Sequence, residues 1–150
     1  MGLTVGDLCN REVVRTAEHE SIRQAARRMR KHHVGDLVVV DDREVPIGIL
    51  TDRDLVVGPL AEGRDVDALT ASEVMSRSLV VAAEEEGLDE ALHRMRSKAV
   101  RRLPVVNSEG DLVGILTVDD VLGVLNEELS KVVRLVMREQ LRETADRRPV

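Results

Sequence analysis

The feature that most constrains this 150-residue chain is an internal repeat. Residues 4–57 align without gaps on residues 70–123, at an offset of 66 positions, and 19 of the 54 aligned pairs are identical. The longest identical run is GILT, at 48–51 and again at 114–117, and each run is followed three residues later by an aspartate. Unrelated segments share only a few residues at one offset, so the chain contains a duplicated unit.

Both copies predict the element order β-α-β-β-α. In the first copy we expect a short strand at 13–16, an amphipathic helix at 21–32, a buried strand at 37–40 and a hairpin return at 47–50, followed by a second helix after Thr51. The second copy predicts the same elements 66 positions later, with strands at 79–82, 103–106 and 113–116, a helix at 88–98 and another helix after Thr117.

A unit of about 50 residues buries only a modest core by itself. We therefore expect an α/β fold in which the two repeats pack together by pseudo-twofold symmetry. The predicted boundaries are 1–57 for the first repeat, 58–69 for a linker containing Gly, Pro and acids, and 70–125 for the second repeat. Residues 126–150 would form a C-terminal helical extension with a polar tail.

The segment from 118 to about 144 is longer than the repeat requires. Its apolar residues recur at alternating spacings of three and four, which is the seam of a heptad pattern, at Leu122, Leu125, Leu129, Val132 and Val136. Val133, Met137 and Leu141 extend an adjacent stripe. Such a helix either lies on its own domain or contacts a second copy or another protein, and the pattern alone leaves both open.

Composition argues against several classes of protein. With 22 basic and 28 acidic residues the net charge is −6, and there is no Phe, Trp or Tyr, so both the basic footprint and the stacking platforms of nucleic-acid binders are missing. One cysteine, Cys9, allows no intrachain disulfide, and we expect it to be a small buried side chain. Apolar runs such as 37–40 are too short to cross a bilayer, and no signal peptide is recognisable. We therefore expect a cytoplasmic protein that binds neither membrane nor nucleic acid.

Motifs for catalysis and for metal binding are also missing from the sequence. No Walker loop, H-E-x-x-H motif or ordered Ser/His/Asp set occurs, so we expect no enzymatic activity. His32 and His33 are adjacent, and adjacent helical residues point about 100° apart, so they form no metal site by themselves. We expect no bound metal and no required cofactor.

The repeated motif G-x-x-T-x-x-D has two interpretations. Thr51 with Asp54, and Thr117 with Asp120, have the spacing of a capping box, in which each threonine and acid close a helix N-terminus. The same place can hold a ligand, because a helix N-terminus attracts phosphate and an aspartate can accept hydrogen bonds from ribose hydroxyls. In that interpretation the glycine of each motif lets the backbone approach the ligand.

The segments LVVVDDREVPIGILTDRDLV and RRLPVVNSEGDLVGILTVDDVL, within the β-α-β-β-α pattern, resemble tandem cystathionine-β-synthase (CBS) domains paired as a Bateman module. The resemblance covers roughly residues 3–125. It implies binding of a regulatory adenosine-containing ligand, such as AMP, ADP, ATP, S-adenosylmethionine or NAD, in clefts between the repeats. It also implies a homodimer and a regulatory role without chemistry of its own.

Carried onto this chain, the resemblance implies a set of ligand-binding residues: Asp54 and Asp120 for ribose hydroxyls, Thr51 and Thr117 for ribose or phosphate, Val14, Val34, Val80 and Val100 beside adenine, and Arg101 with Arg102 for phosphates. The first repeat has Gly35 and Asp36 where the second has its two arginines. An acid repels phosphate, so we expect two unequal clefts. The alternative is a ligand-free homodimeric scaffold, or a module that binds an unidentified protein partner, in which the motifs only cap helices.

Overall fold

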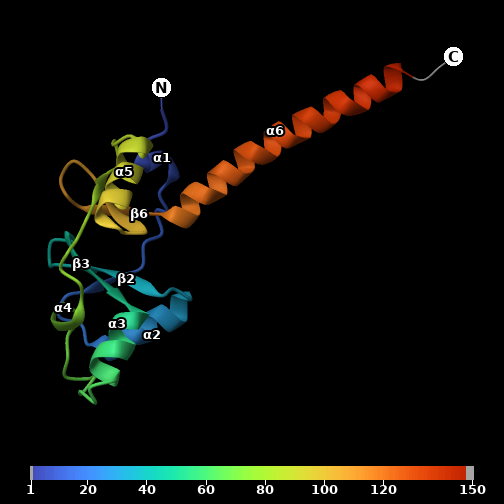
Figure 1. Ribbon diagram of the computed structural model, residues 1–150. Helices are drawn as coiled ribbons and strands as arrows, with labels where there is room; N and C mark the ends of the chain where they lie inside the picture. Colours follow the sequence, from blue (N-terminus) through green and yellow to red (C-terminus); the bar gives the residue numbers. More distant parts are fainter. Residues whose placement is uncertain (1, 148–150) are drawn as a thin grey trace.

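The computed structural model describes residues 2–147 and contains two three-stranded sheets, one in each repeat (Figure 1). The first half contains β1 (Arg15–Ala17), α2 (Ile22–His32), β2 (Asp36–Val40), β3 (Pro46–Thr51), α3 (Asp52–Leu55) and the π-helical turn η1 (Val56–Leu60). The second half contains β4 (Ala82–Ala83), α5 (Leu88–Lys98), β5 (Arg102–Val106), β6 (Leu112–Thr117) and α6 (Val118–Asp146). In each sheet the first strand runs parallel to the second, and the second runs antiparallel to the third. The predicted α/β fold of two β-α-β-β-α repeats with a C-terminal helix is confirmed.

The helices α2 and α5 form where the apolar spacing predicts them. Ser21 and Gln24 make a reciprocal capping box at the start of α2, and the buried face of this helix carries Ile22, Ala25 and Met29. α5 has the predicted bounds and buries the equivalent Ala91 and Met95.

The first strand of each repeat was predicted two or more residues too early. Pairing of β1 begins only at Arg15, opposite Val38, and β4 is confined to residues 82–83. The cause is that the preceding chain is crossing to the other half of the molecule, where Asn10 already pairs with Ile115 of β6. Residues 13–14 and 79–81 therefore bridge the two halves and are not part of a strand.

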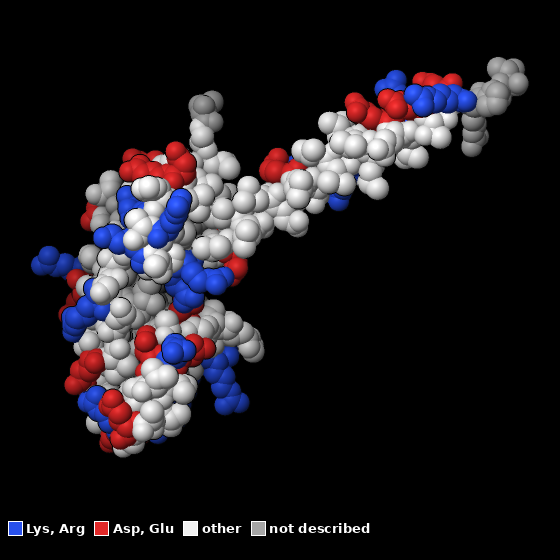
Figure 2. Space-filling model, viewed as in Figure 1, with Lys and Arg blue, Asp and Glu red and all other residues white. Residues whose placement is uncertain are grey.

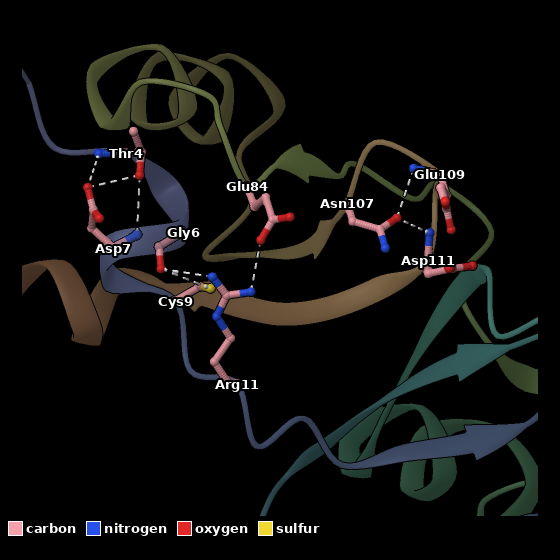
Figure 3. A network of polar contacts seen from close by, with 9 residues as sticks. All are labelled: Thr4, Gly6, Asp7, Cys9, Arg11, Glu84, Asn107, Glu109 and Asp111. Carbon is pink, nitrogen blue, oxygen red and sulfur yellow. Dashed lines mark hydrogen bonds and ion pairs between the residues drawn. The ribbon is translucent and has the colours of Figure 1, made fainter.

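Each repeat lends its first segment to the other repeat. The short helix α1 (Val5–Leu8) lies against the second half, where Val5 and Cys9 join the core around Leu103. The helix α4 (Ala71–Val74) packs likewise on the first half, where Ala71 and Met75 join the core around α2. Figure 3 shows the α1 segment tied to the second half by Arg11, whose guanidinium contacts the Glu84 carboxylate at 2.9 Å. The repeats therefore form one interlocked unit.

This exchange corrects the interpretation of the motif glycines. Gly48 and Gly114 are buried, and each faces the exchanged segment and not an open ligand site. A Cβ on Gly48 would lie 2.7 Å from the Ser76 carbonyl oxygen, and a Cβ on Gly114 would lie 2.6 Å from Cys9 Sγ. Glycine is required because two backbones meet here. Cys9 is buried as predicted, and burial raises the pKa of its thiol.

The helical turn η1 extends into the predicted linker, 58–69, as far as Leu60. The remainder is held against α2. The Leu69 carbonyl accepts a hydrogen bond from the Ile22 amide at 3.0 Å, and Arg23 pairs with Asp67.

The helix α6 does not lie on its own domain. It leaves β6 and projects away from the body (Figure 1), and of its described side chains only that of Val121 is buried. Of the two arrangements left open by the heptad pattern, the one in which the helix covers its own domain is therefore wrong.

Candidate functional site

Two hollows lie at equivalent places in the two repeats. Five lining positions of one correspond to five of the other at the offset of 66: Asn10, Glu12, Val13, Val14 and Val34 in one, and Ser76, Ser78, Leu79, Val80 and Val100 in the other. We call the first the α2 cleft, because it continues over the basic face of α2, and the second the arginine cleft. Their volumes are about 850 Å³ and 550 Å³.

The arginine cleft brings together half of the predicted site residues. Thr51 reaches it from the end of β3 in the first repeat, whereas Val80, Val100, Arg101 and Arg102 come from the second. Residues of both repeats therefore line this cavity, as the resemblance implies, whereas the described residues that line the α2 cleft all come from the first repeat. Its walls are apolar at the valines and cationic at the arginines, and Arg53 adds a third guanidinium.

The α2 cleft contains only Val14 and Val34 of the predicted residues. Its arginines and lysine are Arg15, Arg27, Arg28 and Lys31. Arg15 pairs with Glu44 at 2.8 Å and Arg28 with Glu20 at 2.7 Å, whereas Arg27 and Lys31 have no ion pair within residues 2–147. Thr117 is not among the described residues that line this cleft. Both clefts are therefore cationic in the described chain, and they differ in how many of the predicted site residues line them.

The capping-box interpretation of the repeated motif is confirmed at both helices. Asp54 Oδ2 accepts a hydrogen bond from the Thr51 amide at 2.9 Å, and Asp120 Oδ2 accepts one from the Thr117 amide at 2.8 Å. The threonine hydroxyls accept from the aspartate amides at 3.1 and 3.2 Å. Neither aspartate is among the described residues lining the two clefts.

The caps do not consume the carboxylates. Each uses Oδ2, and within residues 2–147 no hydrogen bond reaches Oδ1 of Asp54 or Asp120. A carboxylate has about four lone-pair sites, so one group can close a helix and still accept from a ligand. A role in ribose binding stays a prediction, and capping does not compete with it.

Asp36 and Arg102 form an ion pair between the repeats. These residues occupy equivalent positions, 66 apart, and Arg102 Nη1 lies 2.7 Å from Asp36 Oδ1. From the sequence alone, Asp36 is expected to repel phosphate and so to make one cleft differ from the other. The structure places it instead against an arginine of the arginine cleft, where it offsets part of the positive charge.

Sequence reasoning missed a pair of ion pairs that hold the framework around each cleft. Arg28 bonds Glu20 at 2.7 Å and the Arg15 carbonyl at 2.6 Å, and Arg94 bonds Glu86 at 2.8 Å and the Val81 carbonyl at 2.9 Å. Each arginine fixes the start of the first strand to the helix that follows it. The signal was available, because the Glu and the Arg of each pair are among the identities of the repeat.

Within residues 2–147, no group of three or more His, Cys, Asp and Glu side chains is placed to hold a metal ion. None of the described helices has the length and apolar composition needed to cross a bilayer.

Comparison with known proteins explains the duplicated architecture. The family model "CBS domain" matches residues 5–58 and 71–127, once for each repeat. The chain belongs to the CBS domain family. Hypoxic response protein 1 of Mycobacterium tuberculosis is 39% identical over 118 residues, which cover 79% of this chain and 82% of that protein. Matching of both repeats identifies the chain as a CBS pair.

Solved CBS structures share the fold. The crystal structure of Hypoxic Response Protein I, with two coordinated zinc ions, superposes with a TM-score of 0.73 at 36% identity, covering 80% of this chain and 97% of that one. A CBS domain pair in complex with 5'-methylthioadenosine and S-adenosyl-L-methionine gives 0.72 at 28% identity, covering 85% and 99%. CBSX2 in complex with AMP gives 0.71 at 26% identity, covering 84% and 98%. The ligands of the last two structures are adenosine compounds, bound by CBS proteins of similar structure.

Proposed function

We propose that this CBS pair is a regulatory module that binds an adenosine-containing nucleotide of the AMP, ADP or ATP type in the arginine cleft. One observation carries the proposal: a cavity of about 550 Å³ joins Thr51 of one repeat to Val80, Val100, Arg101 and Arg102 of the other. That volume is within the range of small-molecule sites, which are about 300–1,000 Å³.

The lining suits the parts of a nucleotide. Val80 and Val100 offer apolar surface to an adenine ring, in a chain that has no aromatic residue to stack on it. Arg101 and Arg102 offer planar guanidinium groups that match phosphate oxygens. Thr51, at the start of α3, can donate its hydroxyl to ribose or phosphate. Asp54, one turn later, is not among the described lining residues, but it keeps Oδ1 for a ribose hydroxyl that extends toward α3.

The α2 cleft is the weaker candidate for a phosphorylated ligand. Glu12 lines it, two of its arginines pair with glutamates, and only Val14 and Val34 of the predicted site residues reach it, although Arg27 and Lys31 also offer positive charge. We expect it to stay empty or to take an uncharged nucleoside.

Regulation follows from the residues that a bound nucleotide would touch. A ligand in the arginine cleft contacts both repeats at once, so it binds more tightly when the repeats are close together than when they are apart. It stabilises the closed arrangement by the difference between these two affinities. We expect this signal to act in the cytoplasm through a homodimer or an unidentified protein partner, without catalysis. S-adenosylmethionine and NAD are further candidate ligands.

The test is a thermal-shift panel followed by calorimetry. A ligand at about 100 times its Kd should stabilise the fold by about 2.7 kcal/mol. An extrinsic dye is needed, because the chain has no Trp or Tyr. For the ligand with the largest shift, calorimetry should show at least tenfold weaker binding by Arg102→Ala and Asp54→Ala.

Controls separate loss of contact from loss of the helix cap. Asp54→Asn keeps an oxygen for the Thr51 amide, and Asp7→Ala removes a matching capping box, with a 2.8 Å bond to the Thr4 amide, away from the arginine cleft. Asp7→Ala should bind as the wild type does. If no adenosine compound shifts the melting temperature, the scaffold alternative is correct. If Asp54→Ala and Asp7→Ala behave alike, Asp54 has no role beyond capping.

A further inference from the structure

The helix α6 presents a long apolar face that the rest of the described chain does not cover. It spans 29 residues, about 44 Å at 1.5 Å per residue. Nine of its large apolar side chains are between 47% and 72% exposed: Leu122, Leu125, Leu129, Val132, Val133, Leu135, Val136, Met137 and Leu141. Most helical stability in proteins comes from packing such a face, so this helix requires an occupant.

The apolar residues form one seam. Leu122, Leu125, Leu129, Val132 and Val136 alternate at three and four positions and so lie along one side of the helix. Figure 2 shows an uncharged surface running outward along α6 from the body, with charged side chains gathered toward the far end. A straight apolar stripe of this type fits a second helix.

Charge is divided between the two halves of α6. Residues 118–130 contain four acids and no base, a net charge of −4, and residues 131–142 contain four bases and one acid, a net charge of +3. Two copies side by side in parallel would set acid against acid and base against base. In an antiparallel pair, the acidic half of each helix faces the basic half of the other.

We propose that α6 pairs in an antiparallel arrangement with α6 of a second copy of this chain. One register sets Leu129 opposite Val132 of the second copy, and Leu125 opposite its Val136, so that four of the five seam residues face one another. Both the seam and the charges are then self-complementary about one twofold axis, as an isologous interface requires. The pair holds the two nucleotide-binding bodies at opposite ends. It rests on α6 alone and is independent of the ligand proposed above.

Engineered cysteines distinguish the orientations in the full-length protein. In the proposed register, a mixture of Leu125→Cys and Val136→Cys chains forms an interchain disulfide under mild oxidation. Each single variant alone does not, because its two cysteines lie eleven residues, about 16 Å, apart along the pair. Wild type, with its buried Cys9, is the control. Self-cross-linking of the single variants would establish a parallel pair. Absence of a cross-link in the mixture would show that the helices do not pair in this register. Either result overturns the proposal.

Charge reversal gives a second, independent readout by sedimentation equilibrium. Glu127→Lys with Glu128→Lys should weaken dimerisation about tenfold, and adding Lys131→Glu with Arg134→Glu should restore it. The matched control, Asp42→Lys with Glu109→Lys, reverses two exposed charges on turns of the body. The apolar variant Leu129→Asp should be monomeric at concentrations where wild type is a dimer. A monomeric wild type, a dimer unaffected by Leu129→Asp, or a dimer strengthened by the double lysine variant overturns the proposal.

Discussion

Replacing Gly48 by alanine tests whether the two repeats interlock as the structure describes. A Cβ at this position would meet the Ser76 carbonyl oxygen at 2.7 Å and Met75 Cγ at 2.9 Å, closer than real Cβ contacts allow. Ser76 cannot move freely, because it exchanges two backbone hydrogen bonds with Ile49, at 2.9 and 3.2 Å. The methyl group must therefore push the exchanged segment away from β3.

The expected loss of stability can be bounded. Overpacking of a well-packed site costs about 1–3 kcal/mol, whereas the lower entropy of the unfolded alanine chain returns about 0.4–1 kcal/mol. The net destabilisation should therefore be about 1–2 kcal/mol. In a chain of this size that lowers the melting temperature by about 2–8 °C, given about 2–4 °C per kcal/mol.

The assay is thermal unfolding followed by circular dichroism, with a glycine of opposite expectation as the control. Gly123 lies in α6, and a Cβ there has no described atom within 4 Å apart from its chain neighbours and the adjacent backbone of its own helix, so Gly123→Ala should stabilise by about 0.5–1 kcal/mol. Gly114→Ala should be partly rescued by Cys9→Ala, because Cys9 Sγ is the atom that the new Cβ meets at 2.6 Å. If Gly48→Ala is as stabilising as Gly123→Ala, the exchange of segments is wrong.

Three further changes have defined outcomes. Asp36→Asn frees Arg102 and removes an anion, so it should strengthen AMP binding about fivefold and leave adenosine binding unchanged. The gain is about 1 kcal/mol at an effective dielectric constant between those of protein and water. Calorimetry with both ligands checks this, and an equal change for the two would contradict it. Arg94→Met should lower the free energy of unfolding in urea by about 2 kcal/mol, because Glu86, only 8% exposed, loses its partner. Restoration of stability by a further Glu86→Gln change would support the pairing. The pKa of Asp67 is lowered, chiefly by a hydrogen bond from Arg23, so the ionised Asp67 stabilises the fold above its unfolded pKa near 3.8, and this stabilisation is lost as the pH falls through the lower folded value. Asp67→Asn and wild type should therefore differ in melting temperature at pH 7 and converge in strong acid. A difference that persists in strong acid would refute the linkage.

Elements with a strong local pattern could be predicted from the sequence. The helix at 88–98 and the apolar strands were found because periodicity and burial act within one repeat. The exchange of α1 and α4 was missed because it depends on contacts between residues distant in the sequence, such as Asn10 with Ile115 and Ile49 with Ser76, which no local pattern encodes. For the same reason the glycines were assigned to a ligand and not to the neighbouring backbone.

The candidate site was predictable as a set of positions but not as a geometry. The resemblance to CBS domain pairs marked Thr51, Val80, Val100 and the two arginines, and the structure gathers these five around one cavity. The sequence could not reveal that Arg102 pairs with Asp36, because Asp36 occupies the position in the first repeat that Arg102 occupies in the second. The Glu86–Arg94 pair was missed because charged identities were not weighed as structural anchors.

The most direct test of nucleotide sensing is a crystal structure of the chain with the adenosine compound that raises its melting temperature most. The account predicts density in the arginine cleft, with the base between Val80 and Val100 and the phosphate on Arg101 and Arg102. A nucleotide bound outside this cleft, or a cleft still empty at saturating ligand, would contradict it.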